Sequence, residues 1–101
     1  MANDVSKLIQ FLISKPLSIK ILYLLRSLPS PPHTRELLGI IGAFTYGHRL
    51  LKQLEDYGLI ERRWRKCRHN SEAWCKYIYI TSKGEEVLDK LSEFLGSYSL
   101  K

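Results

Sequence analysis

Hydrophobic residues recur with a helical period through the first part of the chain. The i, i+3, i+4, i+7 spacing of an amphipathic helix over residues 1–14 is met by Val5, Leu8, Ile9 and Leu12. Pro16 suits the first turn of a second helix through Leu28, because a first-turn residue has no intrahelical use for its N–H. The pattern therefore predicts two helices with a break near Pro16.

The proline-rich segment "PSPP" at 29–32 ends this pattern, since proline clashes with a preceding helical turn. Thr34 is a candidate N-cap for a short helix in "RELLGII", which Gly42 would end. Another helix is expected over residues 43–57, whose apolar side consists of Gly47, Leu50, Leu51 and Leu54. Two short helices joined by a tight turn are typical of a helix-turn-helix unit.

The rest of the chain predicts a β-hairpin and a final helix. Strands are expected over residues 60–67 and 75–80, because "KYIYIT" alternates β-branched and aromatic residues and "RHNSEA" has loop composition. Ser82 and Glu85 form a candidate capping box for a helix over 82–98. Its apolar stripe consists of Val87, Leu88, Leu91, Phe94, Leu95 and Tyr98. The expected fold class is α+β and mostly helical.

Length and hydropathy limit the organisation. A chain of 101 residues with 45% hydrophobic content can bury one modest core, so residues 1–101 are expected to form a single domain. No apolar run approaches the ~18 residues of a membrane span, and no signal-peptide pattern opens the chain. We therefore expect an intracellular, cytoplasmic protein with no membrane partner. Low Asn and Gln content favours a hot, archaeal or archaeal-viral source; for a virus, the cytoplasm is the host's.

Positive charge is concentrated in one stretch. The chain carries a formal charge of +6, and residues 61–76 hold most of it, with Lys and Arg outnumbering Glu61 and Glu72. Such a patch suits a polyanion, nucleic acid before membrane, because no basic amphipathic helix accompanies it. The alternative is a solvated face that serves solubility alone.

Four phrases resemble a known group of proteins when they are taken together and in order. They are "SKPLSIKILYLL" at 14–25, "TRELL" at 34–38, "LLKQLEDYGLIERR" at 50–63 and "YIYITSKGEEVL" at 77–88. The sequence resembles the winged helix-turn-helix transcriptional regulators of the ArsR, MarR and PadR groups over about residues 14–90. The resemblance implies a winged helix with a two-stranded wing, and N- and C-terminal helices that dimerise.

The resemblance also assigns roles to the two cationic segments. It implies that helix 43–57 enters the major groove of double-stranded DNA, presenting Thr45, Tyr46, His48, Arg49, Lys52 and Gln53. It implies that the wing, about residues 61–80, lies on the backbone or in the minor groove through Arg63, Arg65, Lys66, Arg68 and His69. Tyr46 departs from the small polar residue that these families often have. Trp64 and Trp74 are expected to pack over the hairpin.

Two cysteines flank the expected loop of the hairpin. If the turn falls at residues 70–71, Cys67 lies directly opposite Cys75 and Trp64 lies opposite Ile78. Facing cysteines on paired strands are close enough for a disulfide. A structural bridge is the interpretation that we favour; free thiols, or a redox or metal site, are the alternatives.

Metal binding and catalysis find little support in the residues. Cys67, His69 and Cys75 lack a fourth ligand and match no common zinc spacing, so no metal and no other cofactor is predicted. His33 and His48 have no acid and nucleophile suggested by a motif, and no glycine-rich phosphate loop is present. We expect a protein that is not an enzyme.

Two apolar stripes near the ends predict assembly. They exceed what a small domain needs for its own core, so we expect a homodimer on pseudo-palindromic DNA. The expected interface consists of Val5, Leu8, Leu12, Leu88, Leu91, Leu95 and Tyr98. The alternative function is a winged helix that binds another protein and not specific DNA. The sequence identifies no effector and no operator.

Overall fold

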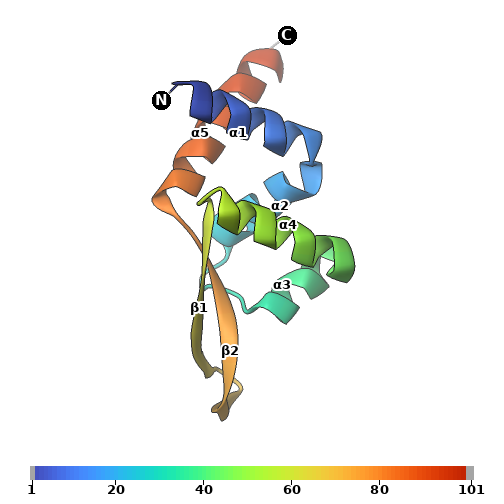
Figure 1. Ribbon diagram of the computed structural model, residues 1–101, viewed down its shortest axis with the longest axis vertical. Helices are drawn as coiled ribbons and strands as arrows, with labels where there is room; N and C mark the ends of the chain where they lie inside the picture. Colours follow the sequence, from blue (N-terminus) through green and yellow to red (C-terminus); the bar gives the residue numbers. More distant parts are fainter. Residues whose placement is uncertain (1, 100–101) are drawn as a thin grey trace.

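The computed structural model describes the backbone of residues 2–99 and the side chains of residues 5–93. The elements are α1 (Ala2–Ser14), α2 (Pro16–Ser27), α3 (Thr34–Ile41), α4 (Phe44–Asp56), β1 (Ile60–Cys67), β2 (Asn70–Ile80) and α5 (Ser82–Ser99). The predicted class, mostly helical with a two-stranded antiparallel hairpin, is confirmed. The hairpin extends well beyond the helices, and the molecule measures 51 × 28 × 25 Å (Figure 1).

The break between the first two helices lies at Lys15, as the proline pattern predicts. Pro16 occupies the first turn of α2, and the buried Ser18 donates its hydroxyl to the Lys15 carbonyl at 2.6 Å. Across this break the axes of α1 and α2 bend by 107°. Among the described residues no single helix is long and apolar enough to cross a membrane, although this bent pair reaches that length and apolarity together.

The N-cap of α3 differs from the prediction. His33, not Thr34, caps the helix, because its Nδ1 accepts from the Glu36 amide at 3.1 Å while the Glu36 carboxylate accepts from the His33 amide at 3.3 Å. Thr34 instead donates its hydroxyl to the Lys76 carbonyl at 3.2 Å, which ties the start of α3 to β2. The reciprocal bonds satisfy two backbone donors that a helix start would otherwise leave unpaired.

A tight turn and a close crossing set α4 against α3. Gly42 ends α3 in the left-handed region with φ 69°, a conformation that glycine adopts without a side-chain clash. Gly47 is buried on α4, and a Cβ at this position would collide with the Leu38 side chain. The helices therefore approach closely at Gly47, and the predicted helix-turn-helix arrangement is present.

The hairpin has a different register from the predicted one. Trp64 pairs with Lys76, not Ile78, and Arg65 rather than Cys67 lies opposite Cys75. Hydrophobic burial fixes this register at the base, where Ile60 faces Ile80.

Residues 71–73 of β2 have no partner on β1 in this register. They form an irregularity beside a two-residue turn at 68–69. Asn70 stabilises it by accepting from the Glu72 amide at 3.0 Å through its side-chain oxygen. The expected loop "RHNSEA" is therefore mostly strand, because β2 begins at Asn70.

The cap of α5 also lies one residue earlier than predicted. Thr81, not Ser82, is the capping residue, since its Oγ1 accepts from the Gly84 amide at 3.0 Å. The same hydroxyl donates to the Gly58 carbonyl at 2.7 Å and fixes the start of α5 against the turn that follows α4.

One hydrophobic core joins the helices to the base of the hairpin, and it absorbs most of the predicted dimer interface. Leu8, Leu12, Leu88 and Leu91 are at most 4% exposed, because α1, α2 and α5 cover each other's stripes within one chain. These four side chains are therefore covered within one chain and leave little surface for the subunit interface predicted from the sequence. Val5 is half-buried, and the side chains of Leu95 and Tyr98 lie outside the described residues.

Candidate nucleic-acid interface

The outer face of α4 is polar and accessible. Its core side carries Leu50, Leu51 and Leu54, which are fully buried. The exposed side chains predicted to meet DNA are Thr45, Tyr46, His48, Arg49 and Lys52. The helical period therefore separates the two sets as the sequence pattern requires.

Gln53 fits this outer face less well than its neighbours. It is half-buried, and its Oε1 is shielded from solvent with no hydrogen-bond partner among the described residues. Lys52 lies outward and forms an ion pair with Asp56 at 3.3 Å. Of these two neighbouring residues, Lys52 is the more accessible.

The wing has two faces of different composition, because side chains alternate along a strand. One face carries Trp64, Lys66, Trp74 and Lys76, and we call it the tryptophan face. The opposite face carries Arg63, Arg65, Cys75, Tyr77 and Tyr79, and we call it the arginine face. The predicted wing cations are thus divided between two surfaces.

The cations of the arginine face already have partners within the chain. Arg63 donates to both carboxylate oxygens of Glu61, at 3.0 and 3.1 Å, and this carboxylate raises the pKa of the guanidinium. Arg63 and Arg65 also lie over the Tyr79 ring, at 5.1 and 5.8 Å from its centroid. These contacts organise the face, and they leave Arg65 without an acidic partner among the described residues.

The tryptophan face carries two cross-strand pairs of a lysine with a tryptophan. Lys76 lies over the Trp64 ring at 5.6 Å and Lys66 over the Trp74 ring at 4.9 Å, each pair directly opposite in the register. An exposed cation–π pair contributes about 0.5–1 kcal/mol. The tryptophans are nevertheless 62% and 59% exposed, so the prediction that they pack over the hairpin is wrong. The register predicted from the sequence was displaced by two residues, so it did not place each lysine opposite a tryptophan.

The tip of the wing is bound to the proline-rich connector, residues 28–33, which joins α2 to α3. The Arg68 amide donates to the Tyr77 hydroxyl at 2.9 Å, and its guanidinium lies 4.7 Å from the Tyr77 ring centroid and donates to the Pro31 carbonyl. The Ile78 amide donates to the Pro32 carbonyl at 2.9 Å. Arg68 therefore holds the wing in place, a role that its position in a basic run does not reveal.

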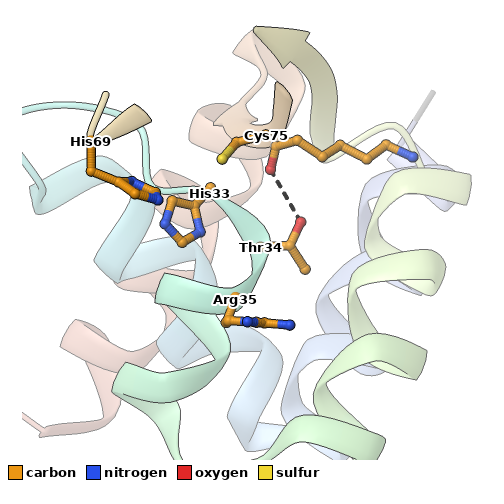
Figure 2. Close-up of a pocket in the computed structure, with 6 residues that line it drawn as sticks. His33, Thr34, Arg35, His69 and Cys75 are labelled. Carbon is orange, nitrogen blue, oxygen red and sulfur yellow. Dashed lines mark hydrogen bonds between the residues drawn. The ribbon is translucent and has the colours of Figure 1, made fainter. Parts of the chain in front are cut away.

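A shallow pocket of about 240 Å³ lies where α3 meets the wing (Figure 2). Its lining consists of His33, Thr34, Arg35, His69, Cys75 and Lys76. The His33 and His69 rings lie 5.8 Å apart, so His69 faces the connector. None of the described residues that line this pocket is acidic, and Arg35 and Lys76 are cations that the site prediction omitted.

The disulfide between Cys67 and Cys75 is present, which confirms the interpretation favoured from the sequence. The Cα atoms are 5.1 Å apart although the residues are not paired, because the irregularity in β2 draws the tip together. Among the described residues no cluster of three or more ligand groups is arranged to hold a metal.

An ion pair links the base of the wing to α4. Arg62 donates from Nη2 to Glu55 Oε1 at 2.9 Å, and its side chain is only 12% exposed. This hydrogen bond lowers the pKa of the Glu55 carboxyl, against the opposing effect of desolvation, and Lys76 adds to the lowering. Arg62 belongs to the tryptophan face of the hairpin, so this face is the one turned toward α4.

Solved structures match this arrangement. The transcriptional regulator BldR from Sulfolobus solfataricus aligns with a TM-score of 0.63 over 82% of this chain at 21% identity. The repressor CouR, solved on a 23-mer DNA duplex, aligns at 0.65 over 80% and 21% identity. A point mutant of S. aureus MepR aligns at 0.72 over 99% and 14% identity.

These matches establish the fold, a winged helix of the type found in MarR-family regulators. The predicted resemblance is confirmed at that level. The chain spans 56% of BldR and 54% of CouR, just over half their length. No family model and no curated protein matches the sequence.

Proposed function

We propose that this protein is a transcriptional regulator that binds double-stranded DNA with sequence preference. In this proposal α4 enters the major groove and the wing lies on the backbone or in the minor groove. The observation that carries it is the exposed outer face of α4, where His48, Arg49 and Lys52 project beside a cationic hairpin. CouR, which shares the fold, is solved on a DNA duplex.

Within α4, different residues would serve different parts of recognition. Arg49 has the donor geometry for a bidentate contact to guanine, whereas Lys52 and the wing cations suit phosphate oxygens. Thr45, Tyr46 and His48 lie on the same outer face and complete the reading surface. Arg35 and Lys76, at the pocket between α3 and the wing, add positive charge beside it.

We also propose that the protein acts as a homodimer on a pseudo-palindromic site. The buried leucines of α1 and α5 do not support this, but α5 continues to Ser99 and passes beyond α1 at the end where both termini lie (Figure 1). Ile13, near the C-terminal end of α1, is 45% exposed. A two-fold axis there would set half-sites about one helical turn, roughly 34 Å, apart.

Fluorescence anisotropy of a labelled duplex tests the proposal. The full chain should bind an arbitrary duplex at low salt and bind sequences selected from a random pool more tightly at higher salt. Arg49→Ala should lower affinity for the selected sequence, while Lys90→Ala, which removes an exposed cation from α5, is the matched control. Absence of binding to any duplex at low salt would reject DNA binding.

A second candidate function is a protein-interaction module. The turn between α3 and α4 exposes Ile40 and Phe44, which are 49% and 53% accessible. Exposed apolar side chains of this size favour a protein partner. Unchanged DNA affinity of the Ile40→Ser variant would be compatible with both functions. Failure of the unmodified protein to bind any duplex would favour this second function.

A further inference from the structure

We propose that the wing contacts DNA through its tryptophan face, with Trp64 and Trp74 lying against the apolar walls of the minor groove and Lys66 and Lys76 reaching the flanking phosphates. This inference rests on the proposed function and specifies the chemistry of one part of it. It replaces the arrangement expected from the sequence, in which arginines lead and tryptophans pack inward.

The first observation is the exposure of two large aromatic side chains in one place. Trp64 and Trp74 are 62% and 59% exposed, and they occupy diagonal positions of the same face. Diagonal side chains on an antiparallel pair lie roughly 7–8 Å apart. The two rings therefore lie close together on this face of the hairpin, whose far end extends beyond the helices (Figure 1).

The second observation is the charge around these rings. Lys66 and Lys76 occupy the other diagonal, each over the tryptophan opposite it. Lysine carries its charge on a flexible stem, so the stem can remain on the ring while the ammonium group turns outward. An apolar centre with a cation at two opposite corners complements a groove whose walls are sugars and whose rims are phosphates.

The third observation is the direction of this face. Arg62 lies on the same side of β1 as Trp64 and binds Glu55 of α4. The tryptophan face is thus continuous with the helix proposed to enter the major groove. The arginine face is turned the other way, and its Arg63 is already bound to Glu61.

The chain offers a direct optical test, because Trp64 and Trp74 are its only tryptophans. Trp64→Phe and Trp74→Phe each leave a single emitter at a known position. Acrylamide quenching is measured on both variants with and without a duplex, while binding is followed separately by anisotropy of a label on the DNA. Each remaining tryptophan should become severalfold less accessible to acrylamide when the duplex is bound.

Replacement by alanine gives an independent measure. Removing one aromatic residue that stacks on a base of a single strand costs roughly tenfold in affinity, and we take this as the scale for one tryptophan in the groove. The pair Trp64→Ala/Trp74→Ala should therefore lose more duplex affinity than either single replacement. The pair Arg63→Ala/Arg65→Ala removes two charges from the opposite face of the same strands and should lose less. Circular dichroism and thermal unfolding verify that both variants keep the hairpin and the helices.

The outcomes separate this inference from the proposal beneath it. Duplex binding that leaves both tryptophans as accessible as in the free protein would overturn the inference and keep DNA binding. A larger loss from the arginine pair than from the tryptophan pair would also overturn it. Shielding that grows with protein concentration in the absence of DNA would assign the face to self-association, and no binding at all would reject both proposals.

Discussion

The helical body and the outer half of the wing are held together by different means. The body buries a continuous set of leucines, many of them with no exposed surface at all. Beyond Ile78 and Tyr77 the wing has no such core, and it depends on a disulfide, cation–π pairs and the bonds of Arg68 to the connector. Stability therefore resides mainly in the body, whereas the surface proposed to meet DNA is divided between the outer face of α4 and the wing.

Removing a core side chain should give the largest effect, and it should be an effect on stability alone. Leu22→Ala leaves a cavity at a fully buried site of α2, outside the proposed DNA surface, and should lower the free energy of unfolding by about 2–5 kcal/mol. Urea unfolding measures this loss, and anisotropy measures DNA affinity under conditions where the variant is folded. A large fall in the affinity of folded protein would mean that body and wing are not separable in this way.

Opening the disulfide should affect the wing more than the helices. Cys67→Ser/Cys75→Ser removes a constraint over a separation of eight residues. The chain-entropy model gives roughly 2–3 kcal/mol for a loop of this size.

The melting temperature should fall by several degrees while the helical circular dichroism signal is unchanged. Amide exchange should quicken near the wing tip first. The single variant Ser71→Ala, at an exposed position of the same strand, serves as a control. Equal acceleration of exchange in α2 would contradict the comparison.

DNA affinity should respond differently to a change on α4 and a change on the wing. Arg49→Ala should cost about 1–3 kcal/mol, mainly on the preferred sequence, if Arg49 contacts a base. Lys66→Ala should weaken binding to all duplexes and reduce the slope of log affinity against log salt by about one unit. Equal losses of Arg49→Ala on selected and random DNA would make Arg49 a phosphate contact instead.

The smallest expected effect concerns the ion pair that joins the two regions. Because Arg62 lowers the pKa of Glu55 in the folded state, this pair stabilises the fold above the ordinary carboxyl pKa, which is about 4.5. Its contribution, about 0.5–1 kcal/mol for a partly exposed pair, should disappear as pH falls below that value. Glu55→Gln should lose stability at neutral pH and approach the wild type in acid; a constant difference at all pH values would exclude the ion pair as its cause.

The helical half of the fold was predictable because its signals are local. Pro16, Gly42 and the spacing of the leucines on α4 each act within one or two turns, and the observed bounds agree with the expected ranges. The caps at His33 and Thr81 were missed by one residue, since histidine is an unusual cap and the Thr81 hydroxyl is selected by its bond to Gly58.

The site was less predictable because it depends on contacts between distant segments. The hairpin register follows from burial of Ile60 and Ile78 in the body, whereas the sequence alone favoured a symmetric turn. That two-residue difference leaves both tryptophans on the same face but places each of them directly opposite a lysine. The apolar stripes of α1 and α5 likewise indicated an interface, but the fold pairs them within one chain.

The connector also determines which edge of the sheet remains open. Pro32 and His33 occupy the outer edge of β2, through the bond from the Ile78 amide and a bridge between His33 and Tyr77. Among the described residues the outer edge of β1 has no strand beside it, and open edges can recruit strands of other molecules into aggregates. Closely spaced cations along β1 would repel a second copy brought alongside in parallel register. The basic run would thus protect the protein from aggregation, in addition to the nucleic-acid binding proposed for it.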